Sequence, residues 1–208
     1  MKRKLLLLVL ILMLTGNAFG ALTALVTTDP ILYDEFDRVG IYHVTLSGDL
    51  EMGPFPTFCL EMDEPLYPDF TTPPIPLDAR IQLNAVSGGV GILGDPLGSE
   101  AAWLYAGFLN GSIPVGDMTD VRLMQEAIWY FEEEPLAVIP TIASNKYLAM
   151  VDSAGPLSGL YGIRVLHLNE GKLGSVQDVL VPIPTPSAIV LGALGVGFVG
   201  WIRKKRVI

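Results

Sequence analysis

Two side chains of this sequence could together form a reactive bond. Cys59 is the chain's only cysteine, and a lone cysteine in an exported protein has no partner for an intramolecular disulfide. Its sulfur must pair with another molecule, remain a free thiol or enter some other chemistry. We favour the third course with Gln125 as the partner, because a thiolate and a side-chain carboxamide held in contact can lose ammonia and join as an internal thioester.

Gln125 lies in a segment with the periodicity of an amphipathic helix. The spacing of apolar residues predicts a helix over about 119–133, which Asp117 or Thr119 can cap and Pro135 ends. The apolar stripe consists of Val121, Met124, Ile128 and Phe131. Gln125 falls on the border of this stripe, where a buried carboxamide without hydrogen-bond partners costs about 1–3 kcal/mol. A covalent bond to the cysteine would remove that cost.

Strand and helix patterns around these two residues indicate an α+β fold. Alternating β-branched and aromatic residues predict strands at 22–26, 39–46, 55–60, 161–168 and 176–180. Helical patterns predict one helix at 100–109, capped by Ser99, and a weaker one at 141–151. Strands followed by helices and then by strands are typical of an antiparallel sheet or a small β-barrel with a helical insertion.

Metal and cofactor sites are not indicated. His43 has no second histidine at ligand spacing. Four acids follow the cysteine closely and could offer oxygen ligands to Ca²⁺, but they lack the twelve-residue loop pattern; they are Glu61, Asp63, Glu64 and Asp69. We interpret them as solvated loop residues. The glycine-rich stretch 87–91 lacks the lysine of a phosphate loop, so we expect no bound metal and no cofactor.

Residues 1–20 have the features of a secretory signal. A basic start (Lys2, Arg3, Lys4) precedes an apolar run over 5–14, and Ala18-Phe19-Gly20 offers small residues for cleavage before Ala21. An uncleaved anchor is the alternative, but the apolar run alone is short for a membrane span. We expect a signal peptide at 1–20 and an ectodomain at 21–180.

The ectodomain is far more acidic than the whole chain. Seven of the 13 basic residues lie in the terminal segments, so six remain against all 22 acids, a formal charge near −16. This charge excludes nucleic acid and anionic lipid as favoured partners, since both require a basic face. It permits cations, amines and neutral glycans, and it also favours solubility outside the cell.

Residues 181–208 divide into three parts. The proline-rich stretch 181–186 is predicted to be a stiff extended linker. An apolar segment follows at 187–202, and the chain ends with the basic residues Arg203, Lys204, Lys205 and Arg206. Sixteen helical residues span about 24 Å, short of a hydrocarbon core of about 30 Å, but Trp201 and the basic residues can extend the segment. We expect a short transmembrane helix with its basic end in the cytoplasm and the ectodomain in the periplasm.

This tail resembles a PEP-CTERM sorting signal. Val181, Pro182 and Pro184 stand where that family has its Val-Pro-x-Pro core, with Ile183 in place of the usual glutamate. The resemblance implies that an exosortase cuts near the proline core. The protein would then pass from the inner membrane to the cell surface or the extracellular matrix, often together with exopolysaccharide.

The ectodomain resembles the thioester domains of bacterial surface adhesins. Three stretches carry the resemblance: Thr57-Phe58-Cys59-Leu60-Glu61, Ala101-Ala102-Trp103-Leu104-Tyr105 and Gln125-Glu126-Ala127-Ile128-Trp129. The resemblance implies a Cys59–Gln125 thioester that captures a nucleophile, typically an amine, on a partner surface. Glu61 or Glu126 could serve as a proton acceptor, but as solvated acids they need no such role, and we favour that second interpretation.

Three classes of function remain open at this point. The first is covalent capture of a partner by the thioester, without turnover as an enzyme. The second is a non-covalent surface or matrix protein in which Cys59 and Gln125 only pack. The third is an enzyme such as a glycosidase, although the acids cluster in loops and the sequence cannot show two of them flanking a cleft.

Overall fold

The computed structural model describes residues 22–34, 39–62, 77–85, 95–136, 138–169 and 175–183. Several predicted segments lie outside these residues: the signal segment 1–20, the glycine-rich stretch 87–91, the apolar segment 187–202, the basic tail 203–206, and the acids Asp63, Glu64 and Asp69. Within the described residues, no helix is long and apolar enough to cross a membrane.

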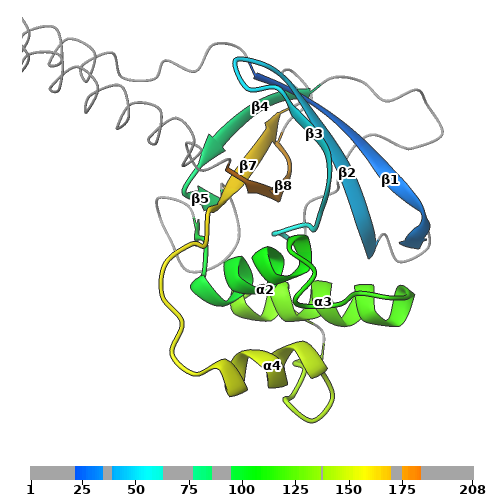
Figure 1. Ribbon diagram of the computed structural model, residues 1–208, viewed down its shortest axis with the longest axis vertical. Coiled ribbons are helices and arrows are strands. Elements are labelled where there is room, and N and C mark those ends of the chain that lie inside the picture. Colours follow the sequence, from blue (N-terminus) through cyan, green and yellow to red (C-terminus); the bar gives the residue numbers. More distant parts are fainter. Residues whose placement is uncertain are drawn as a thin grey trace, which may run out of the picture.

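Six antiparallel strands form the main sheet. They are β1 (Leu22–Asp34), β2 (Val39–Gly48), β3 (Met52–Thr57), β4 (Leu77–Gln82), β7 (Ile163–Asn169) and β8 (Ser175–Pro182), in the order β3-β2-β1-β4-β7-β8. A small second sheet pairs β5 (Asn84–Ala85) with β6 (Asp95–Pro96). The main sheet curls until the chain after β3 meets β8, where Cys59 bridges Val179 (Figure 1). The result is a nearly closed barrel, consistent with the predicted α+β class.

The strands bury both of their faces. On one face, alternate residues such as Ala24, Val44 and Val179 pack together inside the barrel. On the other face, Ile41, Val165 and Leu180 pack against the helices. Both clusters therefore depend on a fixed register, because a shift by one residue would exchange the two faces.

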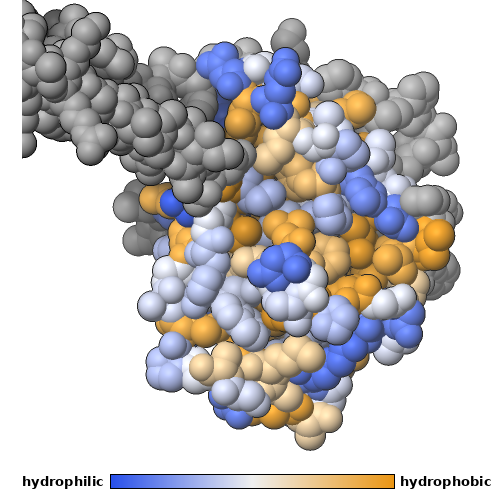
Figure 2. Space-filling model, in the orientation of Figure 1, coloured by the Kyte–Doolittle hydropathy of each residue, from blue (hydrophilic) through white to orange (hydrophobic). Residues whose placement is uncertain are grey.

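Three helices form a layer at one end of the barrel (Figure 1). They are α2 (Ser99–Leu109), α3 (Met118–Phe131) and α4 (Lys146–Ala154). The α2 helix is buried on several sides, and α3 turns the predicted stripe toward the barrel. On the molecular face of Figure 2, apolar and polar residues are interspersed over the sheet and the helical layer.

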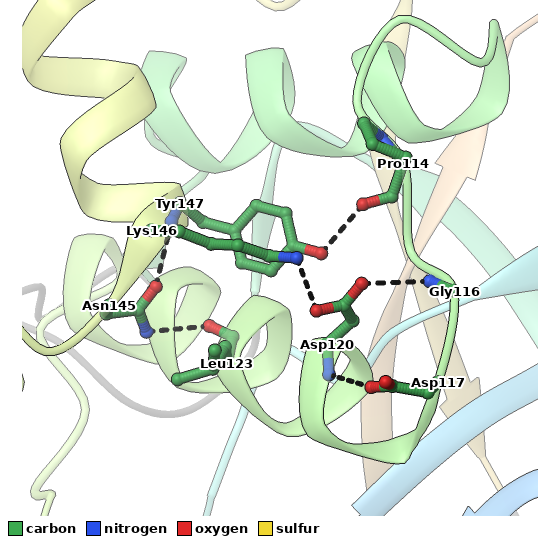
Figure 3. A network of polar contacts seen from close by, with 8 residues as sticks. All are labelled: Pro114, Gly116, Asp117, Asp120, Leu123, Asn145, Lys146 and Tyr147. Atoms are coloured by element: carbon green, nitrogen blue, oxygen red, sulfur yellow. Dashed lines mark hydrogen bonds and ion pairs between the residues drawn. The ribbon is translucent and has the colours of Figure 1, made fainter.

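A polar network fastens α4 to α3 (Figure 3). Asn145 caps α4 by accepting from the Tyr147 N–H, and its Nδ2 donates to the Leu123 carbonyl at 2.8 Å. The Tyr147 hydroxyl donates to the Pro114 carbonyl at 2.8 Å, and Lys146 forms an ion pair with the Asp120 carboxylate. Asn145 and Tyr147 are fully buried, so these bonds fix the helix that carries Gln125.

Several elements differ from the sequence prediction. The N-cap of α2 is Gly98 rather than Ser99. The weaker helix begins at Lys146, because the Asn145 side chain caps it by accepting from the Tyr147 N–H. The strand β4 was not predicted. The predicted linker does not begin at Val181, since β8 continues to Pro182. Val181 is fully buried, and Pro182 can end a strand because no ladder hydrogen bond is needed from its nitrogen.

Asn145→Ala should destabilise the protein by about 1–3 kcal/mol, because it removes both a helix cap and a buried bond to the α3 backbone. Urea unfolding would measure this change. Asn110→Ala is the matched control, since Asn110 is exposed and its side chain accepts only from the Ser112 N–H. Equal stability of the two variants would contradict a fastening role for Asn145.

Candidate functional site

Cys59 lies in an extended segment that uses only one of its edges for strand pairing. The Phe58 carbonyl accepts from the Leu180 N–H at 3.2 Å, and the Leu60 N–H donates to the Asp178 carbonyl at 2.9 Å. In an antiparallel ladder, the N–H and C=O of the intervening residue point to the opposite edge. The backbone polar groups of Cys59 therefore face away from β8.

The Gln125 carboxamide occupies that opposite edge. Its Oε1 accepts from the Cys59 N–H at 3.1 Å, and its Nε2 donates to the Cys59 carbonyl at 2.7 Å. Both residues are buried, with 3% of Cys59 and 1% of Gln125 exposed. The fold thus brings together two residues that lie 66 positions apart in the sequence. The carboxamide forms the same pair of hydrogen bonds with Cys59 that the backbone of a neighbouring strand would form.

The thiol of Cys59 points into the barrel interior. It is a free thiol that packs in the same cluster as Tyr42 and Val179. Burial raises the pKa of the thiol to about 12, hydrogen bonds from Tyr42 and Gln177 lower it, and the nearby Glu61 carboxylate raises it. At neutral pH the thiol is therefore protonated and shielded from reagents in solution.

Glu61 is buried rather than solvated, which corrects the sequence interpretation. Only 2% of it is exposed. Its Oε2 accepts from the Asp178 N–H at 2.9 Å, and its backbone carbonyl accepts from Gln177 Nε2. Gln177 therefore contacts both the thiol and the backbone two residues later. Glu126, the other predicted proton acceptor, is only partly buried on α3.

The middle sequence motif supports the cysteine segment from α2. The buried Tyr105 hydroxyl donates to the Pro56 carbonyl at 2.8 Å. Burial raises the pKa of Tyr105, against a smaller lowering by its hydrogen bond to Thr57. Thr57 donates in turn to the Leu180 carbonyl at 2.6 Å. These bonds hold the backbone just before Cys59 between α2 and β8.

Sequence reasoning missed Tyr42, Gln177 and the positioning role of Tyr105. Gln177 could have been found from the sequence, because alternate residues of a strand lie on the same face and Gln177 alternates with the apolar Val179 and Val181. A polar side chain on such an inward face indicates a buried hydrogen-bonding role. Of the tail residues predicted to form a sorting motif, Val181 and Pro182 lie in β8. Pro184 and the basic tail lie outside the described residues.

A group of buried acids lies where α3 ends. Glu132 accepts from the Gly98 N–H at 3.0 Å. Glu134 accepts from the Met62 N–H at 3.0 Å, and this bond connects the end of α3 with the chain just after Cys59. Burial raises the pKa of Glu132 to about 8; the Gly98 bond lowers it, and Asp95, Glu134 and Glu100 raise it. In the part of the chain that the structure describes, no group of histidine, cysteine or acidic side chains could hold a metal ion.

Comparisons with known proteins gave one structural likeness. No protein-family model matches the chain, and no curated protein matches it. A solved structure, the N-terminal thioester domain of fibronectin-binding protein SfbI from Streptococcus pyogenes, is similar at 14% identity with a TM-score of 0.48. The likeness covers 82% of this chain and 97% of that domain. A likeness at this level carries no functional conclusion.

Glu132→Gln should stabilise the protein at pH 9 and have little effect at pH 4. The folded state holds a proton to about pH 8, whereas the unfolded carboxyl releases it near its ordinary value of 4.5. The wild type therefore loses stability as the pH rises between these values. Glutamine keeps the acceptor for Gly98 without the charge, so we expect a gain of about 1–3 kcal/mol at pH 9.

Chemical unfolding at several pH values would test this prediction. Glu126→Gln on α3 is the control, because Glu126 lies outside the buried acid group. If both substitutions gave the same pH dependence, burial of Glu132 would not be the cause.

Proposed function

We propose that this domain captures a partner covalently through a thioester between Cys59 and Gln125. The observation that carries the proposal is the double hydrogen bond between the Gln125 carboxamide and the backbone of Cys59. It holds the acyl carbon of one residue against the residue that bears the only sulfur nucleophile of the chain. Proximity of this kind supplies much of the rate of an intramolecular reaction.

The two hydrogen bonds suit the formation of the thioester. The Cys59 N–H polarises the Gln125 carbonyl and can stabilise negative charge on Oε1 as sulfur adds to Cδ. For this addition the thiol must turn from Tyr42 and Gln177 toward Gln125, a rotation about its side-chain bond. The C–N bond then breaks, and the sulfur's proton leaves with the nitrogen as ammonia. The products are one thioester and one ammonia.

Capture then consumes the thioester. An incoming amine adds to the acyl carbon, the C–S bond breaks, and one amine proton returns to sulfur. The result is an amide to Gln125 and a free Cys59 thiol. The surrounding core limits the access of water before capture, and the acidic ectodomain attracts cationic amines. Because Gln125 is used up, each chain reacts once, and the protein is not an enzyme in this scheme.

Export and sorting belong to the same proposal. The signal at 1–20 would send the ectodomain to the periplasm, and the apolar segment 187–202 would hold it at the inner membrane until an exosortase cuts the chain. The destination would be the cell surface or an exopolysaccharide matrix, with surface amines or matrix polymers as partners. Support comes from the tripartite tail, with the basic residues at its end.

A non-covalent matrix component is the second candidate. It is favoured by the satisfaction of both reacting groups in the folded state. The Gln125 carboxamide already has two hydrogen bonds, and the thiol already has Tyr42 and Gln177 as partners. Under this alternative, the Gln125 carboxamide would serve only to satisfy the backbone N–H and C=O of Cys59, as a neighbouring strand would.

Intact mass of the denatured mature protein separates the two candidates. On the covalent proposal, the wild type is lighter than its sequence by one ammonia. Methylamine then adds to the thioester and gives an N-methylamide of Gln125, so the treated protein is heavier than its sequence by one CH2 group. Cys59→Ala and Gln125→Ala should have the full mass of their sequences and form no adduct. Gln82→Ala, at a partly exposed glutamine of β4, is the control and should retain the ammonia loss.

A wild type with its full mass and no methylamine adduct would contradict covalent capture. That result would leave the non-covalent candidate.

A further inference from the structure

Trp129 carries a buried hydrogen-bond donor that lacks an acceptor. Its indole Nε1–H is shielded from solvent and has no partner, the only such buried side-chain atom in the described part of the chain. Most buried polar groups in folded proteins are paired, so each exception requires an explanation. An indole N–H can only donate, and it therefore calls for an oxygen or another acceptor.

The position of Trp129 on α3 points to the acceptor. Trp129 is four residues after Gln125, so the two side chains lie on the same face of the helix. Side chains of a helix lean toward its N-terminus, and a large ring covers the turn before its own Cα. From this rule we expect the ring of Trp129 to cover the turn that presents the Gln125 carboxamide to Cys59.

The Gln125 oxygen has room for a second donor. A carbonyl oxygen has two lone pairs, and Oε1 accepts one hydrogen bond among the described residues, from the Cys59 N–H. The other lone pair gains importance when an amine attacks, because the oxygen then carries a full negative charge.

We propose that the Trp129 indole N–H donates to the acyl oxygen of Gln125 during attack by the amine and, with the Cys59 N–H, forms an oxyanion hole. The proposal rests on the thioester proposed above. The amine nitrogen adds to Cδ, and the C=O electron pair moves to Oε1, where both donors hold it. The pair then returns to the carbonyl, the C–S bond breaks, and a proton of the amine passes to sulfur.

A donor without a resting partner is well suited to this task. Only interactions that strengthen in the transition state accelerate a reaction. The Trp129 N–H loses no existing hydrogen bond when it reaches the oxyanion, so its contribution would appear in the rate of reaction. Removal of one oxyanion donor typically slows a reaction about 100- to 1,000-fold.

Trp129→Phe and replacement of Trp129 by 3-benzothienylalanine test the proposal. The second change keeps the shape of the ring and replaces only the N–H by sulfur, so it serves if phenylalanine disturbs the fold. Conversion by methylamine is followed by quenched intact mass across a range of amine concentrations. We expect the limiting rate to fall about 100-fold, with the half-saturating amine concentration and the unfolding midpoint little changed for the benzothienyl protein.

Trp103→Phe on α2 is the matched control and should react like the wild type. If the benzothienyl protein carries the thioester and reacts within twofold of the wild type, the role of Trp129 is refuted while covalent capture stands. If the wild type itself shows no ammonia loss, the thioester proposal fails and this inference fails with it.

Discussion

The site depends on the hydrogen bonds that residues 58–60 form along both edges of their backbone, with β8 on one side and with Gln125 on the other. Residues 58–60 pair with β8 through the backbone of Phe58 and Leu60, and this pairing directs the N–H and C=O of Cys59 outward. A side-chain amide has the same donor and acceptor as a peptide bond, so Gln125 can complete the edge from a helix. The barrel and the helical layer are thus joined at the chain's only cysteine.

Other polar contacts reinforce this junction. Tyr105 holds the backbone before Cys59, and Glu134 holds the backbone after it. Each bond connects a buried side chain of the helical layer with a main-chain group of the cysteine segment. A backbone fixed in this way keeps Cys59 aligned with the Gln125 carboxamide, although Gln125 lies on a helix and not on a paired strand. The contact between Gln125 and Cys59 therefore depends on the helical layer as well as on α3.

The sequence predicted the periodic elements better than the contacts of the site. The stripe on α3 and the alternation in β2 and β7 are local patterns, and the structure confirms them. The strand β4 was missed because it is short and has only one β-branched residue, Ile81. The burial of Glu61 was not predictable, because its partner Asp178 lies 117 residues away on β8. Likewise, periodicity placed Gln125 on the border of the buried face, but it could not show that the carboxamide meets the backbone of Cys59 rather than its thiol.

The last strand gives the molecule a mechanical property. The chain leaves the described fold at Ile183, whose N–H donates to the Gly162 carbonyl at 2.7 Å, directly after β8. A pulling force applied to the chain after Ile183 would therefore load this bond first and then the pairs at Pro182 and Val181. The next contact inward is that between Leu180 and Phe58, beside the cysteine. Tension on the chain beyond Ile183 would thus separate β8 from its neighbours one residue at a time, toward Cys59.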